Sequence, residues 1–204
     1  VEKSPGLKFL GIHAYNGTIQ SVEDFTRRKT LDAESMEKTL TAIKHLQSAD
    51  IPCEVVTAGG TGTYNMTGSY PYITEIQPGS YVFMDAQYSR VLDDFGNSGT
   101  ILTTVISRPT KDRLVVDSGM KALSTDQWPP IIKSVNGATA VSASDEHLTI
   151  QLESEESRQL RPGDKIELIP GHNDTTVNLH TDLFAIRNNK LEAVWPVSAR
   201  AMIR

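Results

Sequence analysis

The sequence predicts an α/β segment followed by a mainly antiparallel β domain. In the first part of the chain, an apolar strand pattern, an amphipathic helix and a second strand pattern follow one another, which is the order of a parallel α/β unit. After about residue 75, short β-rich segments alternate with turn signals, as in an antiparallel sandwich or barrel. We place the boundary near residues 85–95, which gives predicted domains of residues 1–88 and 89–204.

The α/β segment is predicted from three patterns. Leu7–Ala14 is a compact apolar run that indicates a buried strand. Apolar residues at three- and four-residue spacing predict a helix over Glu34–Asp50, with Asp32 as its N-cap. Ile51–Thr57 then predicts a second strand. One helix and two or three strands cannot close a barrel, so only a fraction of an α/β sheet is expected here.

The β domain is predicted from short apolar or alternating runs, with glycines between them. The expected strands are Ser80–Met84, Gly99–Ser107, Arg113–Asp117, Ala138–Val141, Leu148–Leu152, Lys165–Ile169 and Leu191–Val197.

Composition limits the partners. The net charge of −5, without clusters of Lys or Arg, argues against nucleic acid and anionic membranes as partners. The apolar runs are too short to span a bilayer, and we expect no signal peptide. The single cysteine, Cys53, excludes an internal disulfide and is compatible with a reducing cytosol. We therefore expect a cytoplasmic protein.

His172 and Asp174 form a candidate metal pair. They follow the strand pattern that ends at Pro170, and residues two apart on extended backbone point to the same side. A nitrogen and an oxygen ligand suit Zn²⁺, Mn²⁺ or a similar divalent ion, and two protein ligands leave positions open for water and substrate. The alternative is a plain turn, because Gly171 and Asn173 are turn formers.

A glycine-rich loop follows the second predicted strand. Closely spaced glycines can direct consecutive N–H groups at an anion, and threonine hydroxyls can assist. No lysine follows, so the loop is not a Walker A loop, and a flexible turn is the alternative. The candidate phosphate ligands are Gly59, Gly60, Thr61, Gly62 and Thr63.

Two further groups of polar residues have ambiguous roles. Tyr15 and His13 alternate at the end of the first strand, where α/β sheets bind ligands, although a tyrosine of the core fits equally well. Asp117, Lys121 and Asp126 are interpreted as a surface ion-pair cluster.

Taken together, these motifs resemble the D-threonine aldolase and D-serine dehydratase family of pyridoxal-phosphate (PLP) enzymes, which share the alanine-racemase-like fold. Several motifs in the same order carry the resemblance, and it covers essentially the whole chain. The matching stretches are Gly11–Gly17, Ala58–Tyr64, Glu75–Asp85, Asp117–Ser124, Ser144–His147 and Pro170–Asn178.

The resemblance implies the last part of a PLP-binding (β/α)8 barrel, followed by a β domain that carries the metal site. The glycine-rich loop would hold the phosphate of PLP, Tyr15 would lie near its ring, and His172 with Asp174 would bind Mn²⁺, Mg²⁺ or Zn²⁺. The family's dehydratases tend to have cysteine where Asp174 stands, so the resemblance favours an aldolase. The implied reaction is retro-aldol cleavage of a D-β-hydroxy-α-amino acid to glycine and an aldehyde.

The chain departs from the family in length. Members are about twice as long, and the lysine that binds PLP covalently lies in their amino-terminal half; Lys121 is not that lysine. We therefore expect the chain to need an amino-terminal half as partner, to be inactive and poorly stable alone, and to form a homodimer as the family does. The alternatives are a D-serine or D-hydroxyaspartate dehydratase and a non-catalytic fragment that binds PLP or phosphate.

Overall fold

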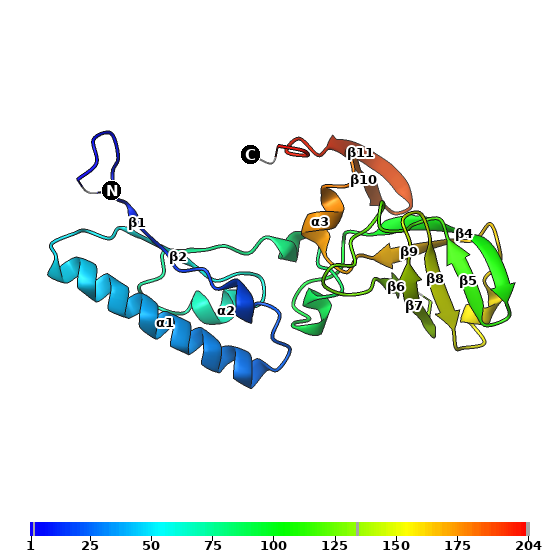
Figure 1. The fold of residues 1–204 in the computed structure, drawn as a ribbon, viewed down its shortest axis with the longest axis horizontal. Coiled ribbons are helices and arrows are strands. Elements are labelled where there is room, and N and C mark those ends of the chain that lie inside the picture. The colour runs from blue at the N-terminus through cyan, green and yellow to red at the C-terminus, as the bar shows by residue number, and fades with distance from the viewer. Residues whose placement is uncertain (2, 134, 203–204) are drawn as a thin grey trace. The chain divides into compact units, whose positions relative to one another are not determined.

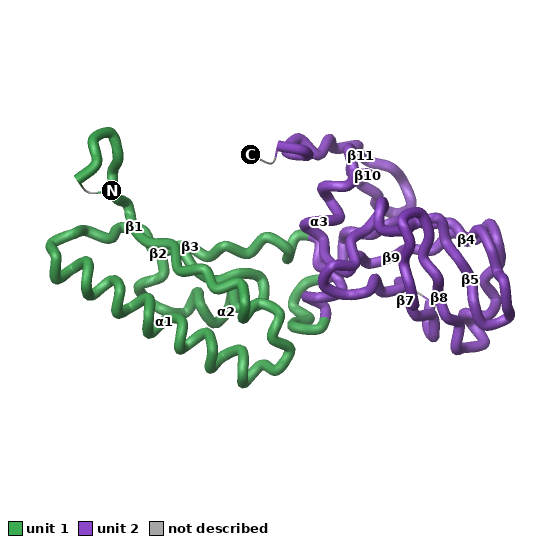
Figure 2. The backbone as a smooth tube through the Cα atoms, in the orientation of Figure 1, with its two compact units in different colours: residues 1–82, 90–95 green, residues 83–89, 96–204 purple. Residues whose placement is uncertain are grey.

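The computed structural model describes residues 1, 3–133 and 135–202. The chain divides into two compact units (Figure 2). Unit 1 comprises Val1–Val82 and Arg90–Phe95, and unit 2 comprises Phe83–Ser89 and Gly96–Arg204.

Unit 1 contains a small parallel sheet whose strand order is β1-β2-β3. Figure 1 labels β1 and β2, and Figure 2 labels β3. A long helix connects the first two strands, as the parallel pairing of β1 with β2 requires. A short helix lies between the second and third strands. The elements are β1 (Gly11–His13), α1 (Phe25–Ser48), β2 (Val55–Ala58), α2 (Tyr64–Thr67) and β3 (Glu75–Ile76).

Helix α1 is longer than the sequence predicts. It begins at Phe25 rather than Glu34, and its N-cap is Asp24, whose carboxylate accepts the Arg27 N–H at 2.6 Å. The predicted N-cap, Asp32, lies inside the helix and is buried. The first turns were missed because their inward-facing positions carry polar side chains. One of them is Arg28, which is buried and donates hydrogen bonds to backbone carbonyls.

The predicted strands of unit 1 are also corrected. The strand expected over Leu7–Ala14 is confined to β1, and the one expected over Ile51–Thr57 begins later and forms β2. The first strand predicted for the β domain, Ser80–Met84, does not form, and the structure has a 3-10 turn at Ser80–Val82. There the Tyr81 N–H bonds a threonine hydroxyl instead of a neighbouring strand.

Unit 2 is built on a closed six-stranded barrel with the order β4-β5-β8-β7-β6-β9. Every neighbouring pair is antiparallel, and β4 closes the barrel by pairing with β9. The strands are β4 (Ile101–Thr110), β5 (Arg113–Val116), β6 (Ile131–Lys133), β7 (Ala138–Ala143), β8 (Leu148–Leu152) and β9 (Lys165–Ile169). The mainly antiparallel β architecture predicted for this part of the chain is confirmed.

The hydrophobic core of unit 2 comes from alternate residues of these strands, because side chains along a strand point to opposite faces in turn. Five of the six barrel strands were predicted, and β6 was missed because it is only three residues long. Leu123, from the segment between β5 and β6, adds to this core. The strand residues of the core are Val105, Leu114, Val116, Ile132, Leu148, Ile150, Leu152, Ile166 and Leu168.

A short helix, α3 (Asn173–Val177), follows the barrel, and a separate two-stranded sheet ends the unit. This sheet pairs β10 (Asp182–Arg187) with β11 (Lys190–Pro196). Strand β10 was not predicted. Its large apolar residues Phe184 and Ile186 are exposed.

In the part of the chain that the structure describes, no helix combines the length and the apolar character needed to cross a membrane.

Candidate functional site

The candidate metal pair lies directly after β9. His172 has extended backbone angles, φ −149° and ψ 119°, and is the N-cap of α3, whereas Asp174 belongs to the first turn of that helix. The prediction that both residues lie on extended backbone is therefore wrong for Asp174. The helical turn nevertheless brings the side chains together, with 3.7 Å between His172 Nε2 and Asp174 Oδ2.

The pair fits a divalent ion. Metal bonds of about 2.1 Å to a histidine nitrogen and a carboxylate oxygen place the two donor atoms roughly 3.0–3.4 Å apart. The observed 3.7 Å needs only a small side-chain rotation, and the Asp174 side chain is 69% exposed and free to make it. Among the described residues, no group of three or more His, Cys, Asp or Glu is arranged to hold a metal ion. The candidate site therefore has two protein ligands.

Asp126 is the neighbour that the sequence interpretation missed. Its Oδ2 lies 3.0 Å from Nδ1 of His172. The expected surface cluster of Asp126 with Asp117 and Lys121 does not form, because Lys121 pairs with Glu146 and Asp117 accepts hydrogen bonds from β4. A separation of 46 residues between Asp126 and His172 gives no local sequence signal.

Asp126 is held as a charged group. Desolvation alone would raise the pKa of its carboxyl, but the hydrogen bonds from Ser124, His172 and Thr175, with the charge of His172, lower this pKa to about 2. When the imidazole is neutral, a carboxylate beside Nδ1 favours the tautomer that carries the proton there, so that Nε2 keeps its lone pair on the side of Asp174. The Asp126 carboxylate thus lies on one side of the His172 ring, and Nε2 on the other side is available to bind a metal ion.

The backbone around His172 is fixed from two sides. The hydroxyl of Thr176 donates to the carbonyl of His172 at 2.7 Å and accepts the N–H of Ser124 at 3.0 Å. Gly171 packs so closely on the chain that a Cβ there would lie 1.7 Å from the carbonyl oxygen of Trp128. Only glycine fits at that position, which explains why Gly171 precedes the pair.

The glycine-rich loop of unit 1 turns directly after β2. Gly59 has φ +69°, a conformation that favours glycine. A Cβ at Gly60 would lie 2.7 Å from Gln20 Oε1, and one at Gly62 would lie 2.0 Å from the Gln20 carbonyl oxygen. The close approach of Gln20 therefore accounts for two of the three glycines, independently of any ligand.

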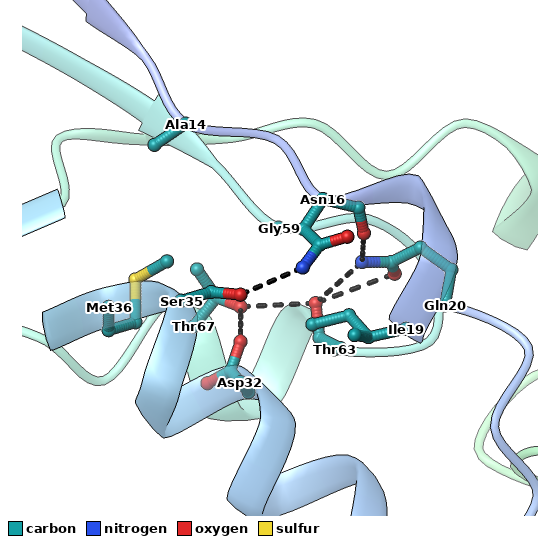
Figure 3. Close-up of a pocket in the computed structure, with 10 residues that line it drawn as sticks. All are labelled: Ala14, Asn16, Ile19, Gln20, Asp32, Ser35, Met36, Gly59, Thr63 and Thr67. Atoms are coloured by element: carbon teal, nitrogen blue, oxygen red, sulfur yellow. Dashed lines mark hydrogen bonds between the residues drawn. The ribbon is translucent and has the colours of Figure 1, made fainter. Parts of the chain in front are cut away.

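A buried polar network connects this loop to α1 (Figure 3). Gln20 accepts the N–H of Gly62 at 3.1 Å and donates to the hydroxyl of Thr63 at 3.1 Å. The hydroxyl of Thr67 lies 3.0 Å from that of Thr63 and donates to Asp32 at 2.6 Å. Burial raises the pKa of Asp32, and the Thr67 hydrogen bond opposes that shift. The loop is thus held rigidly.

The small pocket in Figure 3 is lined by this network and has no room even for a water-sized molecule. Cofactor and drug-sized pockets are usually about 300–1,000 Å³, so unit 1 offers only part of such a site. The N–H groups of Gly60, Gly62 and Thr63 bond within the loop or to Gln20. Thr61 N–H has no acceptor among the residues that the structure describes, which leaves it as a donor for an anion.

Tyr15 lies beside the same loop. Its ring stacks on that of His13, with centroids 6.2 Å apart and planes within 4° of parallel, so the two rings share a face. A Cβ at Gly60 would lie 3.0 Å from Tyr15 Cε2. Tyr15 is partly exposed, and its ring provides an aromatic surface next to the predicted phosphate loop.

Comparison with known proteins identifies relatives along the whole chain. A family model for a serine dehydratase domain matches residues 98–186. The 3-hydroxy-D-aspartate aldolase of Paracoccus denitrificans is 36% identical over 97% of this chain and 52% of the relative. The D-threonine aldolase of an Arthrobacter species is 33% identical over 98% of this chain and 54% of the relative. Relatives at 26–27% identity are named as a D-serine dehydratase and a D-threo-3-hydroxyaspartate dehydratase.

The fold agrees with these relatives. The crystal structure of D-threonine aldolase from Filomicrobium marinum matches all of this chain and 57% of that one, with a TM-score of 0.95 and 32% identity. An alanine-racemase-like protein from Idiomarina loihiensis shares the fold, with a TM-score of 0.79 and 22% identity. The chain spans about half the length of the curated relatives it matches. In sequence and fold, the chain is therefore similar to about half of a D-threonine aldolase.

Proposed function

We propose that the chain is the metal-binding part of a PLP-dependent carbon–carbon lyase of the D-threonine aldolase type. The observation that carries the proposal is the pair His172 and Asp174, 3.7 Å apart, with Asp126 on the far nitrogen of the imidazole. The relatives of highest identity reported above are named aldolases, which supports the same reaction class. The substrate would be a D-β-hydroxy-α-amino acid.

In this proposal, His172 Nε2 and an Asp174 oxygen hold a divalent ion. The ion would act as a Lewis acid at the β-hydroxyl of the substrate, while PLP would supply an electron sink. Asp126 would fix the imidazole and keep its proton on Nδ1. The exposed side chain of Asp174 is able to turn toward the ion.

The cofactor would contact unit 1. Thr61 would offer its N–H to the phosphate, Tyr15 would lie near the ring, and Gln20 would keep the loop in place from behind. The lysine that binds PLP covalently in the family would come from an amino-terminal half. The chain without that half is proposed to be inactive, and the complete protein to act as a homodimer and to complete the (β/α)8 barrel.

Product analysis tests the reaction. The chain is joined to the amino-terminal half of the Paracoccus relative and supplied with PLP, Mn²⁺ and D-threonine. We expect glycine and acetaldehyde in equal amounts, and their loss in the His172→Ala variant.

Other products would contradict the proposal. Ammonia and 2-oxobutanoate would show a dehydratase, which the 26–27% identical relatives favour. PLP binding without any product would show a non-catalytic binding protein.

A further inference from the structure

Asp85 is a fully buried carboxylate in unit 2 for which the proposed reaction has no direct use. It lies in the segment before the barrel, far in sequence from α3. Its Oδ1 accepts the N–H of Tyr88 at 2.9 Å, and its Oδ2 accepts the N–H of Asn173 at 2.9 Å. A buried charged group is costly unless it is well hydrogen-bonded, so such a residue needs a structural or functional reason.

The second partner of Asp85 is the residue between the two proposed metal ligands. Asn173 follows His172 and precedes Asp174, and it is itself buried. Its side-chain amide donates to the carbonyl oxygen of Met84 at 2.6 Å. The segment of Met84 and Asp85 therefore holds both the backbone and the side chain of Asn173.

This contact sets the direction of the flanking side chains. The backbone changes from extended at His172 to helical at Asn173, and this change brings the imidazole and the Asp174 carboxylate together. A metal ion requires its two ligands to stay within a few tenths of an ångström of the bonding separation. A further hydrogen bond, from the Ala86 N–H to the Pro170 carbonyl, joins the same segment to the residues that lead from β9 into the metal pair.

We propose that Asp85 is a positioning residue for the metal pair, acting through the N–H of Asn173. The inference rests on the proposed metal site and extends it. Asp85 does not touch the ion. It fixes the turn that carries both ligands. Removing Asp85 therefore weakens metal binding more than a change elsewhere that lowers the stability of the fold to the same extent.

The test measures binding of Mn²⁺ alone to the purified chain, by the electron paramagnetic resonance signal of free Mn²⁺. Asp85→Asn keeps the size of the side chain but replaces one acceptor with an amide donor, so one of the two N–H groups loses its partner. We expect Mn²⁺ binding about tenfold weaker, the lower end of the effect of removing a group that supports a metal ligand. Asn173→Ala, which keeps the backbone N–H, should weaken it less.

Three controls separate the explanations. Leu114→Ala lowers the stability of the barrel core without touching residues 172–174, and Asp32→Asn removes a buried carboxylate in unit 1; both should bind Mn²⁺ within twofold of the parent chain. His172→Ala should abolish binding.

Unchanged binding in His172→Ala would overturn the metal site itself. Loss in His172→Ala with unchanged binding in Asp85→Asn would overturn only the role of Asp85. If Asp85→Asn does not fold, Asn173→Pro takes its place, because proline is tolerated at the first position of a helix and removes the N–H that Asp85 accepts. Binding in Asn173→Pro equal to that in Asn173→Ala would overturn that role.

Discussion

The Nδ1 atom of His172 lies 3.0 Å from the carboxylate of Asp126, while Nε2 of the same ring faces Asp174. The imidazole is thus held at one nitrogen and available at the other. Histidines that bind metals commonly have this arrangement, in which a carboxylate on one nitrogen orients the ring and strengthens the other as a ligand. The first prediction follows from this geometry.

Removing the Asp126 carboxylate should weaken metal binding. In Asp126→Ala the ring loses its partner, and we expect Mn²⁺ affinity to fall about 10- to 100-fold. Asp126→Asn should retain much of the affinity, because an amide oxygen can still accept the Nδ1 proton. Isothermal titration with Mn²⁺ measures both. Asp145→Ala changes an exposed carboxylate in a β-hairpin turn and should leave the affinity unchanged. Equal affinities for Asp126→Ala and the parent chain would contradict the orienting role of Asp126.

The charge of Asp126 should also appear in the pH dependence of stability. Its pKa is lowered from 3.8 to about 2, so its contribution to stability is complete above pH 4 and is lost as the pH falls toward 2. The carboxylate is 43% exposed, so the contribution is modest, at most about 1 kcal/mol. Urea unfolding of the parent and Asp126→Asn should differ at pH 6 and converge near pH 2. A difference that grows on acidification would refute this assignment.

Asp32 should behave in the opposite way. Burial raises its pKa, so the ionised form destabilises the folded state at neutral pH, and stability is gained as the pH falls through the raised value. In Asp32→Asn the amide oxygen can still accept the Thr67 hydroxyl, and the charge is gone. We expect Asp32→Asn to be as stable as the parent or more stable at pH 7, with the advantage shrinking toward pH 4. Thermal unfolding across this range checks the sign.

Gly62 and Gly79 offer a matched pair of substitutions. A Cβ at Gly62 would lie 2.0 Å from the Gln20 carbonyl oxygen, whereas a Cβ at Gly79 has nothing within 4 Å. Overpacking of this kind costs about 1–3 kcal/mol, which corresponds to a fall in Tm of roughly 2–12 °C for a chain of this size. Gly62→Ala should therefore lower the Tm clearly and Gly79→Ala should not. Similar Tm values for the two variants would mean that the glycine-rich loop can shift away from Gln20 at little cost in stability.

The sequence was most informative where the pattern is local. Strand β8 was predicted with its observed limits because Leu148, Ile150 and Leu152 alternate with polar residues. The pair His172 and Asp174 could be proposed from spacing, although the backbone that unites them is helical rather than extended.

What the sequence did not reveal depends on contacts between distant residues. Asp126 and Asp85 reach α3 from 46 and 88 residues away, and no spacing rule predicts either contact. Gln20 likewise approaches the glycine-rich loop across 42 residues, and this packing explains glycines that the pattern alone attributes to phosphate. A single sequence contains no direct record of such pairs.

The closure of the barrel has a kinetic consequence for the site. Strand β9 pairs with β4, and this pairing joins the two ends of the barrel segment. We expect contacts between residues so far apart in sequence to form late, because the intervening loop must first be ordered. His172 follows β9 directly, so its ring can meet Asp126 only after β9 has docked. In refolding experiments, we therefore expect Mn²⁺ binding to recover with the slowest phase. Chains that have not yet completed this phase should not bind the ion.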